Sequence, residues 1–597
     1  MFESPRFFVY IKKHIISNPP RFGLDLAQQH RAMKKLYCGL VLLVTVLLAS
    51  CSLSSEKEVK YNYLPFQAEE DGKWGMISLD GKVLFEAEFK NMPSTPYYDR
   101  FMVYNKDSLL EYYTVEAKPR LIGKEYQQGT DFSKCGLAVV ARPGKAIEAI
   151  DREGNVVLTL STFEGHKVVA ASSFNDVGLA MVVTEEGFYG CINSEGKTVL
   201  KPNYCSIGIG NDGYIVGIEM KNASDWYKNH SSVKRIIFNE KGEQITELAA
   251  NKYEGILDSD EGYFRVSVVE GKDTIMGIMN PNGEWVVKPA KNVRSINDIH
   301  NGYFTYYDGE SVGLKDFEGN QVIRPKYKQI CFTANNNRLV AFDGDDVDNL
   351  RRKILDYEGN QIGSDTYKGC FYEPFDDYTI VHVSKNNYTS IDKDGNEQKN
   401  VPELYNVDVM PVYNVVRNQE VDIEELVRRL KITEEGLDQM TVGMSVSDVH
   451  QHAISTSDSI MTNIRNIGTP EEYHKNNPTW YSIEYGRFIE NTVVNIRTWF
   501  QQPITKLENN KPVFNNGKSF ILQAFIPTKL PYLKSIETDI YKALRQKFEK
   551  FGSVTQENEN ACIIKGKSHT YCVFLNKQNH YVGFGYDVPN VNIGDFK

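Results

Sequence analysis

Residues 74–83 read WGMISLDGKV, the pattern of two short β-strands joined by a tight turn. Ser78 has a short side chain whose oxygen accepts hydrogen bonds from backbone N–H groups further along, which starts a turn. Gly81 supplies the positive φ that closes the turn. Apolar Ile77 and Leu84 lie on either side of it. The stretch therefore predicts a β-hairpin with one buried face.

The pattern returns along the chain, for example in GCINSEGKTV (190–199) and GLKDFEGNQV (313–322). Ser, Asp or Asn always stands three residues before the turn glycine. Most gaps between these glycines are 36 to 46 residues, and the first gap of 73 holds a degenerate copy, EYYTVEAKPRLI (111–122). The turn glycines are Gly81, Gly154, Gly196, Gly242, Gly283, Gly319, Gly359 and Gly395. About nine repeat units from residue 64 to residue 400 follow from this period.

Two further features flank the hairpins. A second glycine stands six residues before the turn in four copies, namely Gly75, Gly190, Gly277 and Gly313. An additional strand precedes several hairpins, as in FNDVGLAMVV (174–183). Together these motifs resemble the WG-repeat (KWG-type) family of exported bacterial lipoproteins. The resemblance implies a mainly β fold with a tandem repeat array, and it brings no catalytic residues with it.

Three or four strands per unit suit either a closed β-propeller or an open β-solenoid. Nine units exceed the usual blade number of a propeller, although the first and last copies can share a blade. The sequence leaves this alternative open.

The segment MKKLYCGLVLLVTVLLASC (33–51) has a basic start, a short apolar run and small residues before a cysteine. It resembles a bacterial lipoprotein signal, which implies a signal peptide over 33–50, a lipid on Cys51 and a polar tether over 51–63. A plain transmembrane anchor is the alternative, but the run is shorter than the roughly 20 residues of a span. Residues 1–32 do not fit before such a signal, and we interpret them as a gene-model extension.

Cys51 is followed by Ser52, which resembles lipoproteins sorted to the outer membrane. We therefore expect a lipid-anchored protein of the bacterial cell envelope. The net charge is −10, and residues 1–50 contribute seven Lys/Arg and two Asp/Glu, so the remainder carries −15. An acidic body argues against nucleic acid as a partner.

The repeat pattern stops near residue 400. Residues 401–420 read as a linker, and residues 421–597 as an α+β domain. Its clearest helix is PYLKSIETDIYKALRQKFEKFG (531–552), with an apolar stripe at helical spacing. Cys562 and Cys572 flank a predicted hairpin loop symmetrically. They are the best candidates for a disulfide, with buried free thiols as the alternative.

Candidate chemistry is sparse. Two acidic runs, FDGDDVDN (342–349) and IDKDGN (391–396), resemble calcium loops but lack the closing bidentate Glu, so we interpret them as solvated turns. No G-x-S-x-G, H-E-x-x-H or phosphate-binding glycine loop is found. His450, His452, His569 and His580 lack a sequence-level partner. The sequence thus predicts no catalytic residues, no cofactor and no metal.

We expect a non-enzymatic protein whose Tyr-rich β-repeat surface binds a protein, peptide or glycan. Its 35 tyrosines are equally compatible with ordinary packing between repeat units. The alternatives are an envelope enzyme, with its site in the C-terminal domain or in a propeller-mouth pocket, and a structural spacer without a specific ligand.

Overall fold

The structure is a computed structural model. It describes residues 63–596 except 220–232, 249–254, 333–337, 344–350, 364–366, 371–377, 385, 409, 456–464, 468–479, 502–503, 509–510, 515–517 and 590. Cys51 and the predicted signal lie outside these residues. Among the helices that are described, none is both long and apolar enough to cross a bilayer.

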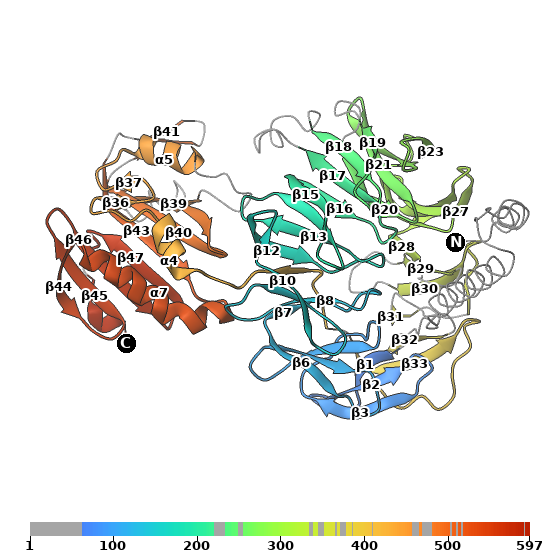
Figure 1. The fold of residues 1–597 in the computed structure, drawn as a ribbon. Helices are drawn as coiled ribbons and strands as arrows, with labels where there is room; N and C mark the ends of the chain where they lie inside the picture. The colour runs from blue at the N-terminus through green and yellow to red at the C-terminus, as the bar shows by residue number, and fades with distance from the viewer. Residues whose placement is uncertain are drawn as a thin grey trace, which may run out of the picture. The chain divides into compact units, whose positions relative to one another are not determined.

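Nine antiparallel sheets follow one another over residues 63–392 of the described chain (Figure 1). The first sheet contains β1 (Tyr63–Gln67), β2 (Trp74–Ser78) and β3 (Val83–Phe89), and the second contains β4 (Arg100–Tyr104), β5 (Leu110–Thr114) and β6 (Leu121–Tyr126). The third contains β7 (Gln128–Gly129), β8 (Ala138–Ala141), β9 (Ile147–Ile150) and β10 (Val156–Leu160). The fourth contains β11 (Thr162–Phe163), β12 (His166–Ser172), β13 (Leu179–Thr184), β14 (Tyr189–Asn193) and β15 (Thr198–Tyr204).

The fifth sheet contains β16 (Ser206–Ile209), β17 (Ile215–Glu219), β18 (Lys234–Phe238) and β19 (Gln244–Leu248), and the sixth contains β20 (Gly255–Asp260), β21 (Tyr263–Glu270), β22 (Asp273–Met279) and β23 (Trp285–Val287). The seventh contains β24 (Ser295–His300), β25 (Tyr303–Tyr307), β26 (Val312–Asp316) and β27 (Gln321–Tyr327). The eighth contains β28 (Gln329–Phe332), β29 (Arg338–Asp343) and β30 (Arg351–Asp356), and the ninth contains β31 (Gly369–Cys370), β32 (Tyr378–Ser384) and β33 (Asn387–Asp392). The degenerate copy at 111–122 forms the β5–β6 hairpin.

The last sheet packs on the first, which closes the ring. Ile380 of β32 lies in one buried cluster with Leu64 and Phe66 of β1, and the hydroxyl of Ser390 donates to the carbonyl of Leu79. After β33 the chain returns as β34 (Asn406–Val407), which pairs with β1 and supplies the inner strand that the first sheet lacks. The array is therefore a closed β-propeller, and the open solenoid is excluded.

The turn glycines behave as the sequence pattern requires. All eight have φ between 75° and 89°. In each turn the Ser, Asp or Asn three residues before the glycine accepts a hydrogen bond from the N–H of the residue after the glycine. Several turns also touch the preceding sheet, since a Cβ on Gly154 would lie 2.1 Å from the carbonyl oxygen of Ile122.

The second glycine of the motif has a different role. A Cβ built on Gly75, Gly190, Gly277 or Gly313 would lie 2.6–2.7 Å from a backbone carbonyl oxygen of the next strand. At three of these positions, in β2, β14 and β26, the register with the next strand shifts. A strand glycine is needed where another backbone approaches this closely.

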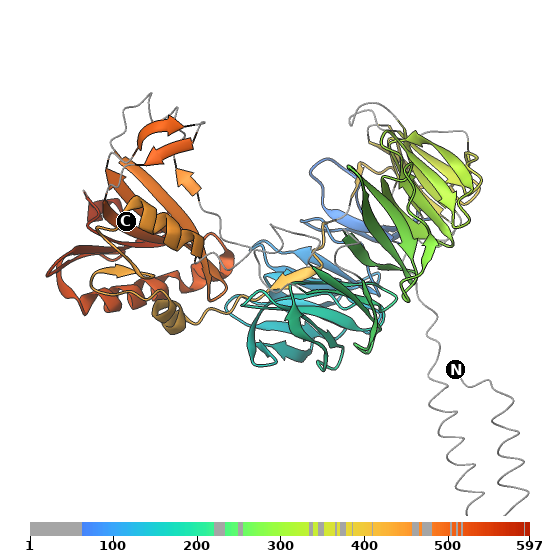
Figure 2. The same ribbon diagram turned by 90° about the horizontal axis from the view of Figure 1, so that it is seen from above.

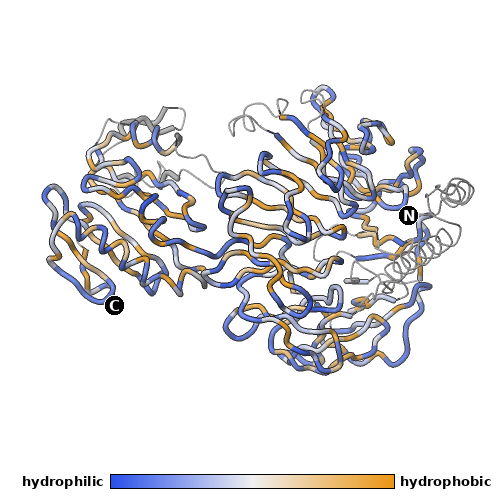
Figure 3. Tube along the Cα trace, in the orientation of Figure 1, coloured by the Kyte–Doolittle hydropathy of each residue, from blue (hydrophilic) through white to orange (hydrophobic). Residues whose placement is uncertain are grey.

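Buried apolar clusters lie between neighbouring sheets around the ring. One joins the first two sheets through Met76 and Phe101, and another joins the fourth and fifth through Cys191 and Ile215. Hydrophobic and hydrophilic residues alternate along the strands in Figure 3. This period-two pattern presents apolar side chains to the adjoining sheets and builds the core of the ring.

The C-terminal region is an α+β domain. An eight-stranded antiparallel sheet has the order β38-β39-β40-β43-β47-β46-β45-β44. Its strands are β38 (Arg465–Ile467), β39 (Trp480–Ile489), β40 (Thr492–Gln501), β43 (Ser519–Pro527), β44 (Gly552–Glu557), β45 (Ala561–Gly566), β46 (Thr570–Asn576) and β47 (Tyr581–Tyr586). Two small hairpins join β36 (Gly436–Leu437) to β37 (Met440–Thr441) and β41 (Ile504–Glu508) to β42 (Lys511–Phe514).

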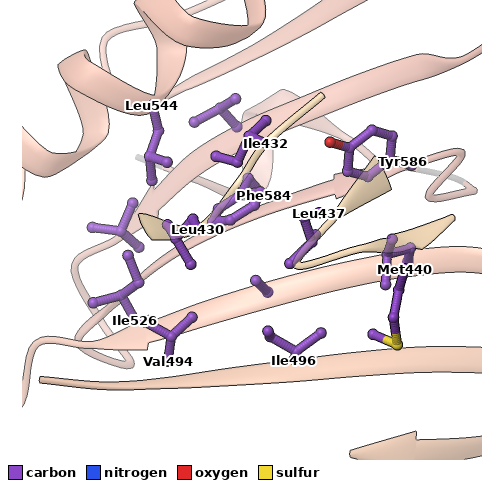
Figure 4. Close-up of a cluster of buried hydrophobic side chains, with 14 of the residues drawn as sticks. Leu430, Ile432, Leu437, Met440, Val494, Ile496, Ile526, Leu544, Phe584 and Tyr586 are labelled. Carbon is purple, nitrogen blue, oxygen red and sulfur yellow. The ribbon is translucent and has the colours of Figure 1, made fainter. Parts of the chain in front are cut away.

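The helices of this domain are α4 (Ile423–Arg429), α5 (Val446–Ser455) and α7 (Pro531–Glu549), and a short 3-10 helix η3 covers Ile593–Asp595. The apolar stripe of α7 faces the sheet, with Leu533, Ile540, Leu544 and Phe548 fully buried. Figure 4 shows Leu544 pointing toward Phe584 and Ile432 in this core. Pro531 occupies the first turn of the helix, where no N–H bond is lost.

Residues 401–420 are predicted from the sequence to be a linker, but two parts of this segment belong to the sheets of the ring. Besides β34, they form β35 (Val415–Arg417), which pairs with β12 in the fourth sheet. We call the described residues 406–408 and 410–419 the strap. Figure 1 and Figure 2 show the chain passing from the strap to the C-terminal domain.

Candidate functional site

Two adjoining cavities lie along the strap, and we call them together the strap groove. The first, of about 370 Å³, is lined by β4, β5 and β7 and by strap residues between 410 and 417. The second, of about 600 Å³, is lined by β12–β14, the strap and the C-terminal domain. Gln127, Gln128, Val415 and Arg417 line both cavities, so the two lie side by side.

The strap is held at both ends by backbone pairing. β34 is antiparallel to β1 through Val407 and Phe66, and β35 is antiparallel to β12 through Val416 and Ala171. Asn418 secures the second end, since its Nδ2 donates to the carbonyl of Val168 at 2.8 Å. Between these ends the strap forms one wall of the groove.

Side chains of the strap also enter the core of the ring. Met410 joins the buried cluster between the second and third sheets, and Val416 joins the cluster between the third and fourth. The strap therefore has a fixed path, and the groove beside it is preformed. Small-ligand and peptide sites are usually preformed in this way.

The second cavity is largely apolar, and one exposed aromatic ring lines the first. Tyr413 is 71% exposed, the most exposed large apolar residue of the described chain. Burial is the main cause that raises the pKa of Tyr104, and the neighbouring phenol of Tyr413 adds to it. Arg417 is the one charged residue lining either cavity, within the part of the chain that is described.

Two polar atoms of the lining stand out. Gln127 Oε1 and Gln419 Oε1 are buried and accept no hydrogen bond from any described residue. Gln419 is 2% exposed, and its amide Nε2 donates to the carbonyl of Arg417 at 2.9 Å, which fixes its orientation. Buried acceptors without a donor are uncommon and need a physical explanation.

The far wall of the second cavity comes from the C-terminal domain, through Phe488, Val493 and Leu530. The turn between β39 and β40 is also held against the ring. The carboxylate of Glu490, 2% exposed, pairs with Lys167 of β12 and with Arg429 of α4, which also pairs with Glu185. This four-charge network ties the C-terminal domain to the fourth sheet.

The histidines of the C-terminal domain have partners far away in sequence. His569 contacts the carboxylates of Asp587 at 2.6 Å and Glu435 at 3.1 Å. His452 lies 3.6 Å from the carboxylate of Asp438, which is buried and also bound by Arg487 and by the hydroxyl of Tyr485. Neither group lines the strap groove. Both fasten the segment 434–440 to the sheet.

The predicted disulfide does not form, and both thiols are free and buried. Cys562 stands opposite Val573, and Cys572 stands opposite Ile563. The symmetric alignment assumed from the loop is off by one residue, and such a slip points the two side chains to opposite faces of the sheet. Accordingly, Cys562 packs with α7 and Cys572 packs with Phe574 in a separate cluster.

The other sequence-predicted residues are scattered. The turn glycines do not line the groove. Asp392 caps its own turn, and Asp343 pairs with Lys353. Asp345, Asp346 and Asp348 lie outside the described residues. Within the described residues, no group of three or more His, Cys, Asp or Glu side chains is arranged to hold a metal.

Sequence reasoning missed the groove itself. Gln127, Tyr413 and Leu530 are far apart in the chain and belong to no motif. One signal was present, because VDVMPVYNVV (407–416) is rich in valine and has no turn glycine, which favours extended chain without a hairpin.

Comparisons with known proteins support the repeat. Residues 189–216 match the family model described as WG containing repeat. No curated protein matches the sequence significantly.

Several solved structures match this chain at low similarity. A computationally designed protein, Ika8, is 11% identical, with a TM-score of 0.31 over 51% of this chain and 98% of its own. BamB from Moraxella catarrhalis is 12% identical, with a TM-score of 0.29 over 51% and 92%. Apo AztD from Citrobacter koseri is 10% identical, with a TM-score of 0.28 over 60% and 98%.

No property of this chain is inferred from such TM-scores. The family match supports the repeat because it falls on β14–β17, where the repeated turn and the strand glycine Gly190 both occur. This match and the ring of similar hairpins identify the chain as a WG-repeat protein with a β-propeller fold.

Proposed function

We propose that this WG-repeat protein is exported, lipid-anchored and non-enzymatic, and that it binds a protein, peptide or glycan ligand in the strap groove at the cell envelope. The observation that carries the binding proposal is the groove. It is preformed, apolar at its base and bordered by the exposed ring of Tyr413. Tyrosine suits recognition because it offers a large contact area and a hydrogen-bonding tip.

The lining supports binding more than catalysis. A general acid, a general base or an activated nucleophile requires Asp, Glu, His, Lys, Cys, Ser, Thr or Tyr beside a second polar partner. Of these types, the described lining contains Thr492, which is buried at the start of β40, and the tyrosines Tyr104, Tyr189 and Tyr413. It contains no Asp, Glu, His, Lys or Cys side chain to act as their partner. Arg417 provides a fixed positive charge for recognition.

Anchoring is supported by the lipoprotein-like segment that ends at Cys51. Acyl chains on that cysteine contribute about 0.8 kcal/mol per buried methylene, so more than one chain gives stable attachment. Growth of a bacterium that expresses the chain with radiolabelled palmitate tests this. Label is expected in the wild type, in the membrane fraction, and is expected to be absent from Cys51→Ser; labelled Cys51→Ser would refute the anchor.

Ligand binding is tested with the Cys51→Ser chain immobilised and exposed to envelope extracts. A specific partner is expected on the parent chain and is expected to be lost from Tyr413→Ala and Val415→Asp. Tyr307→Ala is the matched control, because Tyr307 is an exposed tyrosine of β25 outside the groove. No partner above background, or equal capture by all variants, would contradict the proposal.

A further inference from the structure

We draw no further inference here: the strongest candidate, a polar cavity of about 690 Å³ between the β32–β33 turn and residues 397–405, is lined by solvent-exposed side chains such as Asn387, Glu397 and Asn400, and nothing in the described part of the chain shows what would occupy it.

Discussion

Two turn glycines with the same backbone conformation have different surroundings. Gly154 and Gly319 have φ of 82° and 89°, which disfavours any residue with a Cβ. A Cβ on Gly319 would meet no atom within 4 Å, whereas one on Gly154 would overlap the carbonyl oxygen of Ile122. The first substitution adds backbone strain alone, and the second also pushes one sheet away from its neighbour.

We therefore expect Gly319→Ala to lower the free energy of unfolding by roughly 1 kcal/mol. Gly154→Ala should lower it by roughly 3 kcal/mol, because a steric clash with backbone is added. Urea unfolding followed by tryptophan fluorescence measures both. Equal losses would contradict the close packing of this turn on the preceding sheet.

The free thiols of the C-terminal sheet should be unreactive. Burial raises the pKa of Cys572 to about 12, and burial also raises the pKa of Cys562. Only the thiolate reacts with iodoacetamide. Mass spectrometry should find both residues unmodified in the native protein and both modified after denaturation without a reductant. Modification that requires a reductant would instead indicate a disulfide.

His569 makes the stability of the C-terminal domain depend on pH. Burial lowers its pKa, but the hydrogen bonds that its ring donates to the carboxylates of Asp587 and Glu435 outweigh burial, and the net pKa is raised above 6.5. Because the pKa is raised on folding, the contribution of His569 to the free energy of unfolding is complete below the pKa of the unfolded chain. That contribution is lost as the pH rises through the pKa of the folded protein.

His569→Gln should therefore destabilise the protein most near pH 5.5 to 6, and the difference from the wild type should shrink toward pH 9. Thermal unfolding across this range measures it. Glu435→Gln should lower the stability by a smaller amount relative to the wild type, and this loss should also shrink as the pH rises. A difference that grows with pH would show that the histidine acts only as a packed neutral ring.

Among the elements, hairpins were predictable and long-range pairings were not. Each hairpin turn depends on neighbouring residues, such as Ser78 and Gly81, so the repeat and its mainly β character followed from the sequence. The pairing of Phe66 with Val407 and of Ala171 with Val416 has no local signature. Closure of the ring, and the groove that depends on the strap, therefore needed three-dimensional information.

In the C-terminal domain, the sequence predicts the elements better than the register of their pairing. The α7 helix was predicted because its stripe from Leu533 to Phe548 repeats at helical spacing and Pro531 and Gly552 mark its ends. The register of the β45–β46 hairpin was wrong by one residue, because loop length alone does not determine turn type.

The strap strand β35 can be tested by comparing adjacent residues. Val416 is fully buried between the third and fourth sheets, while Val415 is 42% exposed. Val416→Asp should cost about 3 kcal/mol because it buries a carboxylate without a partner. Val415→Asp should change stability by no more than about 0.5 kcal/mol. Thermal unfolding of both variants tests whether β35 is bound to the ring, and equal effects would argue against it.

At the scale of the whole molecule, one buried carboxylate connects the ring with the C-terminal domain. Glu490 pairs with Lys167 and Arg429. Glu490→Gln would leave these cations less compensated at a buried position, where breaking a pair costs about 3 kcal/mol. Faster tryptic cleavage near residues 417–431 is the expected result. Glu420→Gln is the control, and unchanged cleavage of Glu490→Gln would show that the contact is not maintained in solution.

The closing strand β34 also determines when the first sheet can be completed during synthesis. Phe66 lies 341 residues before Val407, its partner in β34. At a synthesis rate of about 5–20 residues per second, the first strand waits roughly 20–70 s for that partner. During this delay β1 presents an unpaired edge that can pair with other chains. This topology therefore exposes a strand edge during synthesis for longer than an array of independent hairpins would.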